Sequence, residues 1–127
     1  AVLLLRWGRF RALLAGDAGI AAEARMAGRA GHVHLLKVGH HGSRGASGPA
    51  WLHELAPEVA VVSVGAGNRY GHPTAEALAR LTAAGASVWR TDQDGGVAVA
   101  VDSVTMEVRG GGRRERYALP APAPEQR

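Results

Sequence analysis

Turns that carry histidine directly after apolar runs constrain this sequence more than any other feature. One turn is Gly-His-His-Gly-Ser at residues 39–43, another is Gly-His-Pro at 71–73, and each follows a run typical of a buried strand. An acidic turn, Gly16-Asp17, stands in the same position after an earlier apolar run. In α/β proteins the loops that follow core strands hold the ligand-binding side chains. The sequence therefore predicts an α/β fold whose site is built from these turns.

Hydrophobic periodicity predicts the element order ββαβαβαββ. Residues 1–15 alternate apolar side chains on either side of Gly8, as a hairpin of half-buried strands does. The run 59–64 is β-branched and lies between Pro57 and Gly65, which is typical of a fully buried strand. The other expected elements are helices over 18–30, 49–55 and 73–84 and strands over 33–38, 88–90, 96–101 and 104–108. This order predicts a mixed sheet with helices packed on it.

Composition bounds the function only loosely. The chain has 127 residues, enough for one small domain or half of a larger one, and 46% of them are hydrophobic. The formal net charge is +4, and all of the 15 basic residues except Lys37 are arginine. Arginine forks suit phosphate and favour a polyanionic partner, although a GC-rich genome would give the same composition. The absence of cysteine excludes disulfides and cysteine-based zinc sites.

The two ends of the chain differ from its body. Ala1 lies inside an apparent strand and is not an initiating methionine, so we expect a segment cut from a longer protein. Residues 110–127 combine glycines, an arginine cluster and an Ala-Pro run, which predicts a disordered tail beyond a domain of residues 1–109. No stretch approaches the ~18 apolar residues of a membrane span, so we expect the segment itself to be soluble.

Asp17 and His72 each have a functional and a structural interpretation. Asp17 could bridge two divalent cations through its two oxygens, or could cap the helix expected from residue 18. His72 is held between Gly71 and Pro73, and such rigidity suits a metal ligand, although a single histidine before proline is also compatible with a structural role. The residues before it would line the rim of the site as donors to an anionic substrate: Asn68, Arg69 and Tyr70.

His40 and His41 form the other candidate pair. Neighbouring side chains of an extended chain point to opposite sides, so at most one of the two should face a given metal. The other could transfer a proton, or both could be ordinary polar surface. Gly42 would let another backbone pass close by, and Ser43 and Arg44 could contact a phosphate of the substrate.

Taken together, these motifs resemble one family. Residues 13–17 read Leu-Leu-x-Gly-Asp, 36–43 read Leu-Lys-Val-Gly-His-His-Gly-Ser, 63–73 read Ser-Val-Gly-x-x-Asn-x-Tyr-Gly-His-Pro and 90–95 read Arg-Thr-Asp-x-Asp-Gly. The set resembles the C-terminal metallo-β-lactamase-like domain of ComEC-type competence proteins, the DNA-uptake channels of transformable bacteria. The resemblance runs from about residue 3 to residue 101.

The resemblance implies a fold and a chemistry. The fold would be half of an αββα sandwich, and the site a centre of two divalent ions, Zn²⁺ or Mn²⁺, in the complete domain. Asp17 would be the bridging aspartate, and His72 with one of His40 and His41 would supply ligands or acid–base groups. The reaction would be hydrolysis of DNA phosphodiesters in the strand that is not imported, without a small-molecule cofactor. The partners would be single-stranded DNA and the membrane channel of the same polypeptide, which would hold the domain at the plasma membrane.

The ligand-rich part of the family's site is missing from this chain. The family carries His-x-His-x-Asp-His in the first half of the domain, whereas His32 and His34 are followed by Leu36 and Lys37 where aspartate and histidine should stand. We therefore expect no ligand role for this pair, and we expect hydrolysis only when the missing half is present. The remaining polar residues are expected to be structural: His53 on a helix surface, and Asp92 and Asp94 in a strand-joining turn.

Three interpretations follow from the sequence. The first is a half-domain for DNA hydrolysis. The second is a stand-alone metallo-β-lactamase-fold hydrolase of a smaller substrate. The third is a module that guides nucleic acid without catalysis and uses Arg44, Arg69 and Arg90 for phosphate contacts.

Overall fold

The structure is a computed structural model that describes residues 2–65 and 71–120. The expected hairpin, helices and core strands are present in the expected order. The strands are β1 (Leu3–Trp7), β2 (Phe10–Leu14), β3 (Leu35–Lys37), β4 (Val59–Val62), β5 (Ser87–Arg90), β6 (Ala98–Val101), β7 (Thr105–Gly110) and β8 (Arg113–Ala118). The helices are α1 (Ile20–Arg25), the short 3₁₀ helix η1 (Gly39–Gly42), α2 (Pro49–Leu55), α3 (Ala75–Ala83) and α4 (Thr91–Asp94).

The strands form two sheets. The larger has the order β1-β2-β3-β4-β5, in which β1 is antiparallel to β2 and the other neighbours are parallel. The smaller is an antiparallel sheet of β6, β7 and β8. Because β2, β3, β4 and β5 run the same way, their carboxyl ends meet at one edge of the larger sheet. The predicted α/β fold with a mixed sheet is confirmed.

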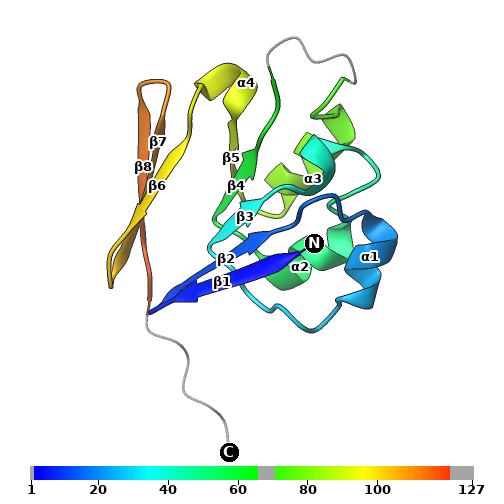
Figure 1. Ribbon diagram of the computed structural model, residues 1–127, viewed down its shortest axis with the longest axis horizontal. Coiled ribbons are helices and arrows are strands. Elements are labelled where there is room, and N and C mark those ends of the chain that lie inside the picture. The colour runs from blue at the N-terminus through cyan, green and yellow to red at the C-terminus, as the bar shows by residue number, and fades with distance from the viewer. Residues whose placement is uncertain (1, 66–70, 121–127) are drawn as a thin grey trace, which may run out of the picture.

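The larger sheet lies between the helices and the smaller sheet (Figure 1). Neighbouring residues of one strand serve the two sides, since successive side chains of a strand point to opposite faces. On β2, Leu13 packs in the helix-side core and Ala12 in the core between the sheets. Trp89 of β5 is fully buried between the sheets. Burial of such a side chain contributes about 2 to 3 kcal/mol to folding.

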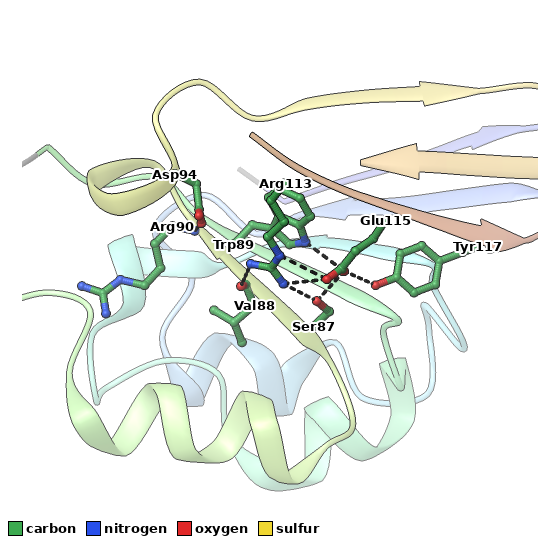
Figure 2. A network of polar contacts seen from close by, with 8 residues as sticks. All are labelled: Ser87, Val88, Trp89, Arg90, Asp94, Arg113, Glu115 and Tyr117. Carbon is green, nitrogen blue, oxygen red and sulfur yellow. Dashed lines mark hydrogen bonds and ion pairs between the residues drawn. The ribbon is translucent and has the colours of Figure 1, made fainter. Parts of the chain in front are cut away.

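The expectation of a disordered tail from residue 110 is wrong for residues 113–118, which form β8. Glu115 on β8 accepts hydrogen bonds from Ser87 Oγ at 2.6 Å and Trp89 Nε1 at 3.3 Å, both on β5 (Figure 2). Arg113 lies 4.0 Å from the centre of the Trp89 ring and donates to the Val88 carbonyl. These contacts tie β8 to the larger sheet.

Glu115 stays ionised at low pH because of this network. Burial alone raises the pKa of its carboxyl group, but hydrogen bonds from Ser87, Tyr117 and Arg113 outweigh burial and lower the pKa to about 2. A strand rich in charged residues is therefore ordered by its pairing with β7, by these polar partners and by the packing of Tyr117 on the core between the sheets. Residues 121–127 lie outside the described part of the chain.

Other differences from the sequence expectations are small. Helix α1 ends at Arg25, well short of residue 30, and Gly28 then turns the chain with a φ of +80°. Residues 91–94, expected as a turn, form the single turn of α4. Within residues 2–65 and 71–120, no helix is long and apolar enough to cross a membrane.

Candidate functional site

The three predicted turns meet at the carboxyl edge of the larger sheet. Gly39, which follows β3, lies so close to the acidic turn that a Cβ on it would stand 3.1 Å from the Ala15 Cβ and from the Ala18 carbonyl oxygen. The backbone N–H of His40 donates to the Gly16 carbonyl at 2.8 Å. The first histidine turn is therefore packed directly on the turn that carries Asp17.

Gly42 joins the first histidine turn to the second. Its φ is +80°, and a Cβ on it would lie 2.6 Å from the Cβ of Pro73, a distance that real Cβ atoms do not reach. The N–H of Thr74 donates to the Gly42 carbonyl at 3.0 Å. The prediction that Gly42 permits a close backbone approach is confirmed, and the approaching segment is the one that begins with His72. The His72–Pro73 peptide bond is cis.

His40 and His41 do not continue the strand in an extended conformation. Both have a φ of 52°, in the left-handed region, so the reasoning from strand alternation does not apply to them. Such a conformation costs about 1 to 2 kcal/mol per residue outside glycine and persists only where the surroundings fix it. The side chains nevertheless find different neighbours. The His40 ring lies 6.1 Å from the His72 ring between centroids, and His41 Nδ1 lies 2.8 Å from the Ser63 carbonyl oxygen.

The contact with Ser63 determines the tautomer of the neutral His41 ring. A carbonyl oxygen can only accept, so Nδ1 donates the proton and the lone pair of the neutral ring stands on Nε2. Histidine ligands of metals are commonly oriented in this way by a carbonyl that accepts from the second ring nitrogen. Both His41 and His40 are exposed, so His41 Nε2 is accessible from outside the fold.

Asp17 is exposed and does not cap the following helix. Helix α1 begins at Ile20, its N-cap is Gly19, and no side chain bonds to the cap. The structural interpretation of Asp17 as a cap is therefore wrong. Among the residues that the structure describes, Asp17, His40, His41 and His72 do not form a group of three metal-ligating atoms within 4.8 Å of one another. The residue types fit a metal centre, but this chain alone does not close one.

Only two of the predicted substrate-binding residues, Ser43 and Arg44, lie in the described part of the chain. Ser43 Oγ accepts from the Gly45 N–H at 3.1 Å, and Arg44 is exposed. Asn68, Arg69 and Tyr70 lie outside the described residues.

Sequence reasoning missed two side chains that hold the loop after η1. Glu23 is only 2% exposed, and its carboxylate accepts from the N–H groups of Ser47 at 2.6 Å and Gly48 at 2.8 Å. Arg80 of α3 donates to the carbonyls of Arg44 and Ala46. An acidic residue on the inner side of a short helix is the signal that could have revealed Glu23.

A second histidine cluster lies at the opposite, amino edge of the larger sheet. His34 and Glu58 precede β3 and β4, and His32 Nε2 lies 3.1 Å from Glu58 Oε1. Ligand atoms of His32, His34 and Glu58 all lie within 4.8 Å of one another. Glu58 could not be recognised as a partner of His32 and His34 from local motifs, because it is far from them along the chain. In spacing alone the cluster resembles a zinc site, in which neighbouring ligand atoms stand about 3.3 Å apart.

The hydrogen bonds of His34 oppose a metal at this cluster. The Arg11 N–H donates to His34 Nδ1 at 3.1 Å, which uses the one lone pair of the neutral ring and leaves the proton on Nε2. His34 is 5% exposed and stacks on Phe10, and burial is the largest cause that lowers its pKa. Burial and this hydrogen bond thus favour the neutral ring, and the expectation of no ligand role for His32 and His34 stays a prediction.

Arg90, expected as a phosphate contact in the non-catalytic interpretation, is already paired. The Arg90 guanidinium donates to both carboxylate oxygens of Asp92, at 3.1 and 2.8 Å. The backbone N–H of Arg90 donates to the Asp94 carboxylate. The hydrogen bond from Arg90 holds the pKa of Asp92 below its usual value. Both aspartates thus hold the end of β5 in place.

His53, expected on a helix surface, is exposed on α2.

The chain is similar in sequence to curated proteins named for competence and recombination. It is 46% identical over 61 residues to ComE operon protein 3 of Bacillus subtilis (strain 168), a match that covers 48% of this chain and 8% of the relative. It is 37% identical over 86 residues to competence protein ComA of Neisseria gonorrhoeae, covering 65% of this chain and 12% of the relative. It is 32% identical over 108 residues to recombination protein 2 of Haemophilus influenzae, covering 85% of this chain and 14% of the relative.

The matches cover 48% to 85% of this chain but only 8% to 14% of these much longer relatives. No family model matches the chain. No solved structure matches it either. The expected similarity to competence proteins is confirmed at this level. The metallo-β-lactamase-like domain, its metal ions and the roles of the site residues stay predictions.

Proposed function

We propose that this chain is part of a metal-dependent hydrolase domain that cleaves DNA phosphodiesters for a competence protein. The observation that carries the proposal is the meeting of three ligand-bearing turns at one sheet edge, with His40 beside His72 and bonded through its N–H to Gly16. The names of the relatives support a role in competence and DNA uptake. Through the longer protein the chain would be held at the membrane, next to the channel through which DNA passes.

The proposed roles follow the accessible atoms. Asp17, His41 and His72 would hold divalent metal, Zn²⁺ or Mn²⁺, together with ligands from a segment outside this chain. His41 is preferred over His40 as the ligand, because its Nδ1 bond to Ser63 leaves the lone pair on an accessible Nε2. His40, which lies beside His72, would transfer a proton, and Ser43 and Arg44 would contact the phosphate. When bound, the metal would supply hydroxide at neutral pH and offset the charge that develops on the phosphate.

The first test is cleavage of labelled DNA by the protein that joins this chain to the sequence encoded upstream of it. We expect cleavage that requires Zn²⁺ or Mn²⁺ and that Asp17→Ala or His72→Ala abolishes. His53→Ala is the matched control, because His53 is exposed on α2 and outside the proposed site. Cleavage by the Asp17→Ala protein at the wild-type rate would overturn the proposal.

The same assay separates the other interpretations. A stand-alone hydrolase of a small substrate would need no upstream ligands, so this chain alone would hydrolyse such a substrate with bound metal. A module that only guides nucleic acid would bind DNA with a steep salt dependence and cleave none, whatever metal is added.

A further inference from the structure

The outer face of the smaller sheet is strongly basic. Side chains of Glu107 and Arg109 on β7 and of Arg114 and Arg116 on β8 share this face, since they alternate with the inward residues Met106 and Val108. Arg114 and Arg116 are 65% and 70% exposed, and both pair with the same carboxylate, that of Glu107. One carboxylate thus stands among three guanidinium groups.

Arg109 and Arg114 are directly opposite each other in the β7–β8 register. Like charges in this position repel across a strand pair and destabilise the sheet. Arg114 Nε lies 3.5 Å from Glu107 Oε1, whereas Arg116 Nη2 lies 3.0 Å from Glu107 Oε2. Glu107 therefore interacts more closely with Arg116 than with Arg114. Glu107 offsets part of this repulsion but is shared among three arginines, so a further anion between Arg109 and Arg114 is favourable.

A hollow of about 430 Å³ lies beside this pair. It is lined by Arg109, Arg113 and Arg114 and by the backbone of Gly96, Gly110 and Gly112, where no side chain hinders an approaching group. Arg113 turns inward to Glu115 and Trp89 (Figure 2), so Arg109 and Arg114 are the side chains left to meet a ligand. Arginine is suited to phosphate through its fork of donors.

The hollow is placed at the same edge of the fold as the histidine turns. Gly110 and Gly111 pack against Asp94 of α4, which follows the carboxyl end of β5. In Figure 1 the β7–β8 turn and α4 stand together at the upper edge, toward which β4 and β5 also run. A DNA strand that enters the candidate site could therefore also cross this hollow.

We propose that Arg109 and Arg114 form a binding site for the phosphate backbone of DNA, which guides the strand to the candidate site at the same sheet edge. The inference rests on the proposed function for the nature of the polyanion. It differs from that function in its residues, since neither arginine belongs to the three ligand-bearing turns.

The test is the binding of labelled oligothymidylate to the full chain, measured by fluorescence anisotropy at several NaCl concentrations with EDTA present to exclude metal. In Arg109→Ala/Arg114→Ala we expect roughly tenfold weaker binding at low salt and a salt slope smaller by about 1.5. The control is Arg6→Ala/Arg25→Ala, which removes the same charge from exposed positions on β1 and α1. Thermal unfolding should show the Arg109→Ala/Arg114→Ala protein to be about as stable as the wild type, because the repulsion between the two arginines and the ion pair of Arg114 with Glu107 are lost together.

The outcomes distinguish the two proposals. A loss of affinity and slope in the Arg109/Arg114 variant, greater than in the control variant, supports the site. Equal losses in both variants overturn the site and leave the proposed function standing. Absence of DNA binding by the wild-type chain overturns the site, and cleavage of DNA by the longer protein then still tests the proposed function separately.

Discussion

The two edges of the larger sheet each carry a histidine cluster, and the clusters differ in what holds them. At the amino edge the donor atoms of His32, His34 and Glu58 lie within 4.8 Å of one another. The ring centroids of His32 and His34 lie 4.9 Å apart, whereas those of His40 and His72 at the carboxyl edge lie 6.1 Å apart. By distance alone, the amino edge is the better metal site.

Hydrogen bonds reverse that order. The lone pair of His34 already accepts from the Arg11 N–H, so the ring has nothing to offer a metal without losing its Nε2 proton. The Nδ1 of His41 donates to the Ser63 carbonyl, which leaves a lone pair on an accessible atom. The difference teaches that the tautomer of each ring, and not only the spacing of the rings, separates a structural cluster from a ligand set.

Gly42→Ala should have the largest effect on stability, because Gly42 packs directly against the second histidine turn. The new Cβ would lie 2.6 Å from that of Pro73, and the residue would keep a φ of +80°. We expect a loss of about 3 kcal/mol in the free energy of unfolding, from backbone strain and overpacking together. Denaturant unfolding measures the loss.

Gly28→Ala is the matched control for this change. Gly28 has the same φ of +80°, but a Cβ on it would meet nothing within 4 Å. The control should therefore cost only the backbone term, about 1 kcal/mol. Equal losses at the two positions would mean that the carboxyl-edge turns are not held together by close packing.

The elements of the fold were more predictable from the sequence than the two clusters were. The alternation of residues 1–15 and the β-branched run 59–64 identified strands, and Pro49 marked the start of α2. The left-handed conformation of His40 and His41 could not be predicted, because only the packing of three turns imposes it. The amino-edge cluster needed Glu58, which no local motif links to His34. Strand β8 pairs with β7 across the turn Gly111–Gly112, and it was missed because its charged run shows no apolar alternation.

Substitutions of His34 should produce the second largest effect and test whether the amino-edge cluster is structural. His34→Ala removes the acceptor of the partly buried Arg11 N–H and the ring stacked on Phe10, and we expect a loss of about 2 kcal/mol. His34→Asn keeps an acceptor close to the position of Nδ1, so it should recover about half of that loss. Denaturant unfolding of both variants would contradict a structural role if neither were less stable than the wild type.

Substitutions at the two edges should differ in their effect on zinc affinity, and this effect should be smaller in free energy than the losses of stability above. In the protein that joins this chain to the sequence upstream of it, we expect His41→Ala to weaken binding of Zn²⁺ at least roughly tenfold, because loss of a ligand costs no less than loss of the group that orients it. His34→Asn should leave the affinity unchanged, because the lone pair of His34 is occupied in the wild type. Competition with a colorimetric chelator measures both. The opposite result, a loss only in His34→Asn, would move the metal site to the amino edge.

The smallest expected effect is a dependence of stability on pH that belongs to the amino edge. Burial is the largest cause that lowers the pKa of His34. The charges of His32 and Arg11 act in the same direction, and the charge of Glu58 and the backbone hydrogen bond from Arg11 oppose them. Below the ordinary pKa of 6.5 the unfolded chain takes up a proton that the folded chain refuses, so this contribution to stability is present above 6.5 and is lost as the pH falls. Glu115, whose pKa is lowered to about 2, adds its own acid loss only below its ordinary pKa of 4.5. Unfolding of the wild type and of His34→Asn between pH 6.5 and 4.5 therefore isolates His34. A wild type that loses no more stability than the variant in that window would show that His34 is not held neutral, and would reopen the amino edge to a metal.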